Sequence, residues 1–137
     1  MSGLAGIVAG HIQPGVYRWH AAFHAPEVQH TVEHAGWRFG YVDGWHEQSK
    51  SEFLKAIGAA LEFAGDCSHD VDALSDCLSG LSEPTVLLWD GWAPLARADE
   101  DAFDTVVKLM NDRAGSGPPF AALLRGDGPD VDVPSLD

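Results

Sequence analysis

Basic side chains are scarce in this chain. Lysine and arginine together number 8 among 137 residues, against 21 aspartates and glutamates, and the formal net charge is −13. Direct binding to nucleic acid or to an anionic membrane is therefore disfavoured, because phosphate contacts need clustered Lys and Arg. A basic protein or a bound cation is favoured as the partner instead.

Cysteine and long apolar segments are also scarce. The two cysteines, Cys67 and Cys77, are too few for a disulfide framework and lack the CxxC spacing of zinc or thioredoxin-type sites. We expect reduced thiols that are at least partly buried. No apolar run approaches the roughly 20 residues that span a bilayer, and the glycine-interrupted N-terminus lacks the basic segment of a signal peptide. The sequence thus favours a cytoplasmic location.

The order of predicted strands and helices indicates one domain with an α/β fold. Residues 1–36 are expected to form an N-terminal extension packed on the domain, with an irregular lead-in, a short strand near 16–19 and a short helix that ends at Gly36. From Trp37 on, the pattern predicts strand, two helices, strand, helix and strand, over 37–42, 50–61, 70–78, 85–89, 99–114 and 120–124. Strands separated by helices imply a parallel sheet. Residues 127–137 are expected to be a flexible acidic tail.

Three of the predicted helices begin with capping signals. Ser49 and Glu52 match a capping box. Asp70 is a good N-cap, and Gly80 lies near the end of the same helix. The helix from Asp99 begins with three consecutive acids near the positive end of its dipole.

Acidic side chains are concentrated where basic ones are missing. Residues 56–96 contain no Lys or Arg and seven acids: Glu62, Asp66, Asp70, Asp72, Asp76, Glu83 and Asp90. Like charges held close together cost stability, so the cluster suggests that a partner supplies the positive charge. We expect Glu62, Glu83 and Asp90 to contribute to solubility only.

On the helix predicted over 70–78, Asp72 and Asp76 lie four residues apart and share one exposed face. Roles as a general acid and base are disfavoured, because exposed positions offer little burial to separate their pKa values. No P-loop, GxGxxG fingerprint or nucleophile elbow appears in the sequence. We therefore expect neither an enzyme nor a cofactor.

Asp112 is a further anomaly, because it lies near the C-terminus of the third helix, where the dipole disfavours a carboxylate. Pairing with Lys108, four residues earlier, is one explanation. Contact with a basic partner is the other.

The segment Asp72-Ala73-Leu74-Ser75-Asp76-Cys77-Leu78, followed by Val86-Leu87-Leu88-Trp89, resembles the barstar family of intracellular ribonuclease inhibitors. The resemblance covers roughly residues 37–126 and implies a small three-stranded parallel sheet flanked by helices. It implies that Asp72 and Asp76 enter the active site of a basic secreted bacterial ribonuclease, or of a related toxin, in place of substrate phosphates. Counting on from Trp89 places Asp112 at the family's third contact acid. The expected partner-binding residues are Asp66, Asp70, Val71, Asp72, Ser75, Asp76, Gly80 and Asp112.

Several aromatic positions of the family carry other residues here. Residues 64–70 lack the family's two aromatics, and Ser75 and Leu81 stand where the family often has tryptophan. Aromatic side chains often dominate interface energies. The alternative function is therefore a barstar-fold interaction module whose partner is not a nuclease.

Two histidine pairs with four-residue spacing lie outside this pattern: His20 with His24, and His30 with His34. Helical histidines at this spacing can bind zinc, with Glu27 as a further ligand. A solvated polar face is the alternative, and we expect no metal site.

Overall fold

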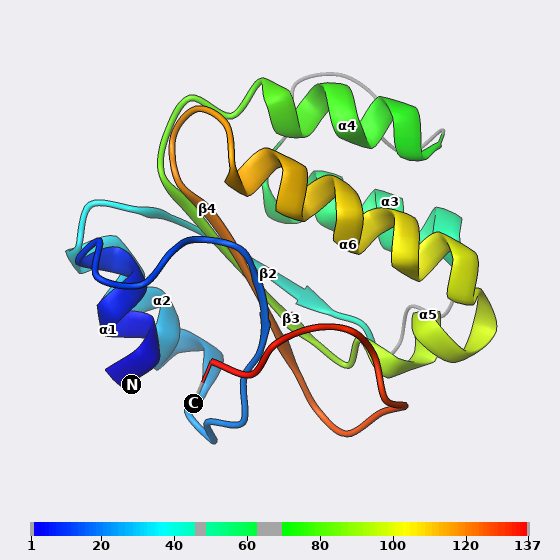
Figure 1. Cartoon of the computed structure of the whole chain (residues 1–137), viewed down its shortest axis with the longest axis horizontal. Coiled ribbons are helices and arrows are strands. Elements are labelled where there is room, and N and C mark those ends of the chain that lie inside the picture. The colour runs from blue at the N-terminus through cyan, green and yellow to red at the C-terminus, as the bar shows by residue number, and fades with distance from the viewer. Residues whose placement is uncertain (1, 46–48, 63–69, 137) are drawn as a thin grey trace.

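The computed structural model describes residues 2–45, 49–62 and 70–136. Within these residues, parallel strands form one sheet in the order β1-β4-β3-β2, and helices cover both of its faces (Figure 1). The strands are β1 (Val16–Arg18), β2 (Arg38–Asp43), β3 (Thr85–Asp90) and β4 (Phe120–Arg125). The helices are α1 (Ser2–Val8), α2 (Ala25–His34), α3 (Lys50–Ala60), α4 (Val71–Ser79), α5 (Ala93–Ala98) and α6 (Glu100–Ala114). The predicted parallel α/β architecture is confirmed.

The sheet has four strands, so the prediction of three was wrong. The additional strand is β1, which pairs in parallel with β4 and places Val16 opposite Ala122. The short strand itself was predicted, but its place in the sheet was not. Its partner lies far along the chain, and local periodicity carries no information about such a pairing.

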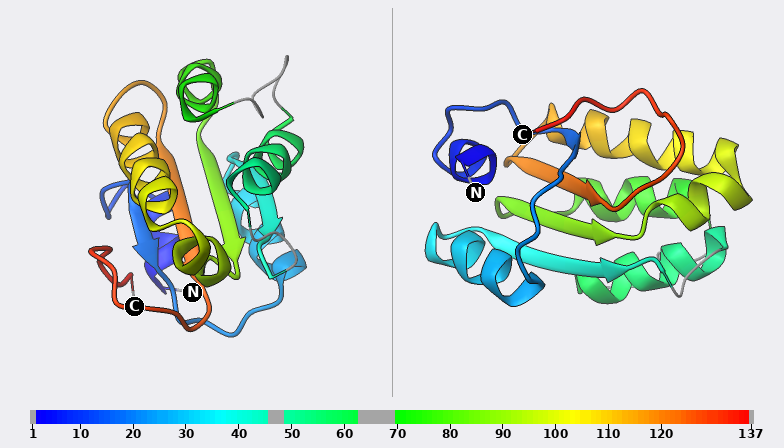
Figure 2. Two further views of the ribbon diagram at one scale, coloured as in Figure 1. Left: turned by 90° about the vertical axis from the view of Figure 1, so that its right-hand side faces the viewer. Right: turned by 90° about the horizontal axis from the view of Figure 1, so that it is seen from below.

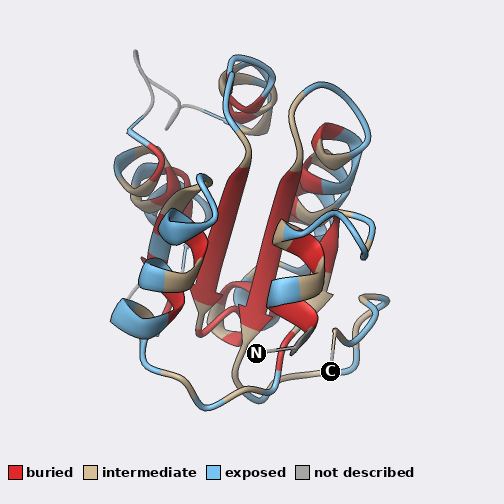
Figure 3. Cartoon of the chain, turned by 90° about the vertical axis from the view of Figure 1, so that its left-hand side faces the viewer, coloured by how far each residue is buried: buried red, intermediate tan, exposed pale blue. Residues whose placement is uncertain are grey.

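The two central strands form the buried middle of the domain. The first five residues of β3 and of β4 are buried, and only the last, Asp90 or Arg125, is partly exposed. Figure 3 shows both strands buried between helical layers. Continuous apolar runs are typical of parallel strands that are covered on both faces.

Alternate strand residues contribute to two hydrophobic clusters. Leu87, Trp89 and Leu124 pack with residues of α3, α4, α5 and α6 on one face. Val86 and Leu123 pack with residues of α1 and α2 on the other. Figure 2 shows the two helical layers on either side of the sheet. Consequently α4 and α6 share one face of the molecule, and α2 lies on the opposite face.

The two ends of the chain meet at the β1 edge. The Arg18 amide donates to the Pro134 carbonyl at 2.8 Å, and the Leu136 amide donates to the Arg18 carbonyl at 2.8 Å. Val131 and Val133 pack against the α6 side of the core. The C-terminal segment, expected from its composition to be flexible, thus makes main-chain and apolar contacts with the domain.

The predicted helix starts are confirmed. The Ser49 hydroxyl accepts from the Glu52 amide at 3.1 Å, and an Asp99 carboxylate oxygen accepts from the Ala102 amide at 3.1 Å. The Asp70 carboxylate caps α4 in the same way. These caps satisfy main-chain donors that have no partner within a helix.

Three features differ from the expectations. Residues 2–8 form α1 rather than an irregular lead-in, and α5 was not predicted. Cys77 is disulfide-bonded, so the expectation of reduced thiols was wrong for this residue, and Cys67 lies outside the described residues. Disulfide formation depends on Cα separation, which sequence spacing alone does not give. In the part of the chain that the structure describes, no helix has the length and apolarity that crossing a membrane requires.

Candidate protein-binding site

The α4 helix presents two carboxylates on its exposed side. Leu74 and Leu78 are fully buried in the core, whereas Asp72 and Asp76 are exposed. Asp72 lies in the first turn, where the helix dipole stabilises a negative charge, and Asp76 lies one turn later, where this effect is weaker. The predicted division of α4 into a core stripe and an acidic stripe is present in the structure.

Asp112 lies on the neighbouring helix of the same face. The helices α4 and α6 run side by side (Figures 1 and 2). A small cavity of about 110 Å³ lies between them, lined by Ser75, Leu78, Ser79, Leu109, Asp112, Arg113 and Ser116. Asp112 is exposed, and no ion pair with Lys108 occurs among the described contacts. The fold therefore brings Asp112 beside the acidic helix although it lies 36 positions after Asp76 in the sequence.

Arg113 fixes the position of α6 relative to the end of α4. Its guanidinium donates to the main-chain carbonyls of Leu78 at 2.7 Å, Leu81 at 3.0 Å, Ser116 at 2.6 Å and Pro118 at 2.7 Å. Leu78 lies in the last turn of α4, where main-chain acceptors lack partners in the next helical turn, and Leu81 lies two residues beyond the helix. Arg113 is only 5% exposed, and burial lowers the pKa of its guanidinium. The role of Arg113 has no signature in the sequence, because an arginine near a helix C-terminus usually indicates no more than an interaction with the dipole.

A second cavity lies on the other side of α4. It has a volume of about 400 Å³ and is lined by Arg38, Leu61, Glu62, Asp76, Cys77, Gly80, Leu81 and Ser82. Arg38 is held at its rim by the Leu61 carbonyl at 2.6 Å and by Glu62 at 3.2 Å. Asp76 lines this second cavity and is exposed, so its carboxylate is accessible to a partner.

A groove lies on the far side of α6, under the C-terminal segment. Two adjoining cavities, of about 430 and 480 Å³, share Phe103, Asp104, Val131 and Asp132 in their walls. Asp112 lines the first of them as well as the small cavity beside α4. The hollowed surface therefore continues from α4 across α6 to the C-terminal segment.

The remaining predicted contact residues have different surroundings. Asp66 lies outside the described residues. Asp70 is exposed, and its carboxylate accepts from the Ala73 amide at 2.9 Å. Val71 is half-buried and packs against the core, Ser75 lines the small cavity, and Gly80 lines the second cavity. Asp70 therefore has a structural role as a cap in addition to its position near the acidic stripe.

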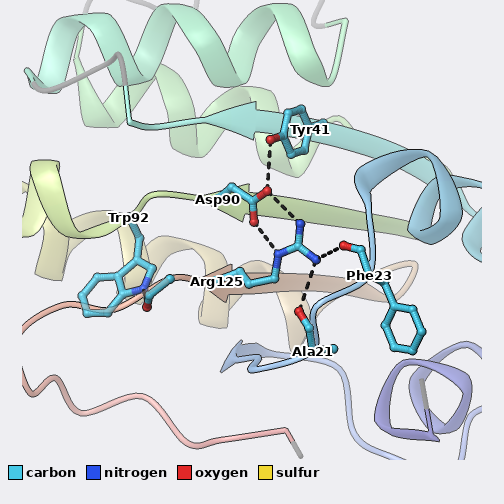
Figure 4. Close-up of polar contacts among 7 residues, drawn as sticks. Ala21, Phe23, Tyr41, Asp90, Trp92 and Arg125 are labelled. Atoms are coloured by element: carbon cyan, nitrogen blue, oxygen red, sulfur yellow. Dashed lines mark hydrogen bonds and ion pairs between the residues drawn. The ribbon is translucent and has the colours of Figure 1, made fainter.

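A polar cluster that the sequence did not reveal lies at the carboxyl ends of β2, β3 and β4. Arg125 forms a two-pronged ion pair with Asp90, at 2.6 and 2.8 Å, and donates to the carbonyls of Ala21 and Phe23 (Figure 4). Asp90 was expected to contribute only to solubility, but it is an ion-pair partner whose side chain is 15% exposed. The cluster ties the N-terminal extension to the sheet.

Tyr41 completes this cluster. Its hydroxyl donates to Asp90 at 3.0 Å. Partial burial, followed by the hydrogen bond to Asp90, raises the pKa of Tyr41 to about 12, although 39% of the residue is exposed. The same hydrogen-bonded ion pair raises the pKa of Arg125. Tyr41 and Arg125 therefore keep their protons at neutral pH and act as fixed donors.

The large exposed aromatics of the described residues lie on β2 and in the turn after it, and none lies on α4. Among the described residues, Tyr41 and Trp45 are the exposed large hydrophobic side chains, at 39% and 49%. Trp45 lies against Gly91, where an added Cβ would come within 2.7 Å of the indole. No group of three or more metal-ligating side chains occurs within the described ranges. The exposed side chains of α4 and α6 are thus mainly carboxylates and small polar groups.

Comparison with known proteins agrees with this geometry. Residues 37–125 match the family model described as Barstar (barnase inhibitor). No curated protein matches the chain. Among solved structures, the chain is similar to the ORC2 protein of Aeropyrum pernix in ADPNP–ADP complexes, with a TM-score of 0.61 and 12% identity over 93% of this chain. The chain spans 39% of the length of that protein, and at this identity the likeness concerns the fold alone. The matched residues run from the start of β2 to the end of β4 and include α4 and α6, so the chain belongs to the barstar family.

Proposed function

We propose that the chain is a protein inhibitor of a basic bacterial ribonuclease, or of a related toxin, and is not itself an enzyme. The family match supports an inhibitor or interaction module. The observation that carries the proposal is the placement of exposed Asp72, Asp76 and Asp112 on two helices of one face.

The mechanism is substrate mimicry by carboxylates. A ribonuclease active site binds phosphates through Arg, Lys and His side chains. Asp72 and Asp76 on α4, with Asp112 on α6, offer carboxylate acceptors for the same donors, and charge-assisted hydrogen bonds are stronger than neutral ones. The net charge of −13 adds a long-range attraction that speeds encounter with a basic partner.

Preorganisation is the contribution of the fold. Arg113 links α6 to the end of α4 through main-chain carbonyls, so the acids keep their relative positions before binding. Ordering side chains and segments at an interface costs free energy. A rigid arrangement of the acids therefore favours tight binding.

The direct test is inhibition of RNA hydrolysis by purified basic secreted ribonucleases titrated with this protein. We expect stoichiometric inhibition of at least one such enzyme, with association that slows as salt concentration rises. A complex that forms while RNA hydrolysis continues at full rate would overturn the inhibitor proposal.

The alternative is an interaction module whose partner is not a nuclease. The specific observation in its favour is the lack of an exposed aromatic at two positions: Ser75 of α4 lines a cavity, and Leu81, two residues beyond the end of α4, is only 6% exposed. Neither residue offers the exposed aromatic ring that often dominates interface energies. Pull-down from the native cell, followed by mapping of the bound surface, separates the two: a partner without nuclease activity that protects α4 supports the alternative.

A further inference from the structure

His30 and His34 form a cluster of metal-ligating side chains far from the candidate protein-binding site. Both are exposed on α2, four residues apart, and their imidazole rings stack with centroids 5.9 Å apart and an interplanar angle of 22°. The opposite side of α2 packs on the sheet through Val28 and Val32. The two rings therefore project together into solvent from a helix whose orientation is fixed by the core.

We propose that His30 and His34 chelate a transition-metal dication of the Zn²⁺, Ni²⁺ or Cu²⁺ class. Neutral imidazole nitrogen is a preferred ligand of these ions. Two histidines at i and i+4 on one helical face recur in protein zinc sites because this spacing brings both rings to one ion. Hard cations such as Mg²⁺ prefer oxygen ligands and do not compete for this pair.

The ring separation is close to what chelation requires. With metal–nitrogen bonds of about 2.0–2.1 Å and an angle near tetrahedral or square-planar at the metal, the centroids of two bound imidazoles lie about 4.5–5.2 Å apart. The observed separation is 5.9 Å. The stacked rings are only 22° from parallel, so chelation requires side-chain rotations that turn both nitrogens toward one ion and shorten the centroid distance by about 1 Å. Both rings are exposed, so these rotations need no movement of the backbone.

The protein supplies two ligands, and water or a further group completes the coordination shell. Glu27 begins the same helical face, but within the described residues no third metal-ligating side chain joins the pair. Glu33 is held by Gln29 at 3.4 Å. A two-histidine site of this kind binds reversibly and leaves coordination positions open.

The chain contains its own matched control. His20 and His24 have the same four-residue spacing and are also exposed, but they lie before the start of α2 in non-helical backbone. Sequence spacing alone predicts the same metal affinity for the two histidine pairs. The helical geometry instead assigns the chelate to His30 and His34.

The site is independent of the inhibitor proposal. It lies on α2, within residues 1–36, which precede the family match at 37–125. It also lies on the opposite face of the sheet from α4 and α6. Metal binding there can be measured on the isolated full chain, whatever partner α4 engages.

The experiment is isothermal titration of the full chain with ZnCl₂ and with NiCl₂, in a buffer with excess Mg²⁺ that occupies carboxylate sites. We expect one site per chain, with affinity reduced about tenfold or more by His30→Ala or by His34→Ala, because one imidazole then holds the ion alone. The His20→Ala/His24→Ala variant should bind like the wild type. Since alanine favours helix, circular dichroism of the His30 and His34 variants should be unchanged.

A second readout follows from linkage, because an ion that binds only the folded state raises the melting temperature. The wild type and the His20→Ala/His24→Ala variant should show this increase, and the His30→Ala/His34→Ala variant should not. Absence of binding heat in the wild type would overturn the proposal. So would binding that survives in the His30→Ala/His34→Ala variant, which would indicate a site elsewhere.

Discussion

Arg113 of α6 donates its Nε hydrogen to the main-chain carbonyl of Leu78, in the last turn of α4, at 2.7 Å. The bond joins the helix that carries Asp112 to the helix that carries Asp76. Three more carbonyls accept from the same guanidinium. The buried guanidinium of Arg113, whose hydrogens are accepted by main-chain oxygens, thus fixes the position of α6 relative to α4.

Replacing Arg113 with Ala should destabilise the protein by about 3–5 kcal/mol, because four main-chain carbonyls lose a charged donor and a void opens between the helices. Urea unfolding measures this change. Arg97→Ala is the control, since Arg97 is exposed on α5 and its loss should cost no more than about 0.5 kcal/mol. Equal effects of the two substitutions would show that Arg113 does not link the helices.

The capping role of Asp70 can be separated from any contact with a partner. Asp70→Ala should lower the free energy of unfolding by about 1 kcal/mol, because the Ala73 amide loses its acceptor. Asp70→Asn retains an acceptor and should preserve stability, so its effect on partner binding reports the charge alone. A loss of stability in Asp70→Asn equal to that in Asp70→Ala would contradict the capping role.

The raised pKa of Tyr41 predicts a pH dependence of stability at high pH. The folded pKa is about 12, against an ordinary value of 10.0. The folded state therefore favours the neutral phenol, and its contribution is complete below pH 10.0 and is lost as the pH rises toward 12. Stability of the wild type should fall more steeply over this interval than that of Tyr41→Phe. Parallel pH profiles of the two proteins would contradict the assignment.

The disulfide at Cys77 predicts a dependence on redox conditions. Reduction should lower the free energy of unfolding by about 2–4 kcal/mol. Urea unfolding with and without reductant measures this, and Cys77→Ser should be insensitive to the reductant. Alkylation of Cys77 in the native, unreduced protein would show that the bond is absent in solution.

Local signals in the sequence were sufficient for α2, α3, α4 and α6 and for most of the sheet, but not for α1 and α5. Ser49, Asp70 and Asp99 cap helices where predicted, because a cap depends only on residues within one turn. The apolar runs of β3 and β4 likewise reflect their own burial. The pairing of β1 with β4 depends on a distant segment, and it was missed as a result.

The site was predictable only in part for the same reason. Asp72 and Asp76 share a helical face, which their spacing alone determines. Arg113 acts through carbonyls of α4 and the following loops, and Asp90 acts through Arg125, a residue of a different strand. Neither role has a local signature, since each arises when separate elements pack together.

In the proposed function, affinity for the partner comes from specific contacts of the three acids on α4 and α6 and not from the overall net charge of the protein. The most direct test of this claim compares two triple variants of equal net charge: Asp72→Asn/Asp76→Asn/Asp112→Asn, and Glu27→Gln/Glu33→Gln/Asp127→Asn, whose acids are exposed outside α4 and α6. The affinity of each for an inhibited basic ribonuclease is measured at physiological salt. We predict that the first variant loses at least about 30-fold, roughly 2 kcal/mol, while the second stays near the wild type. Equal losses in the two variants would contradict the account.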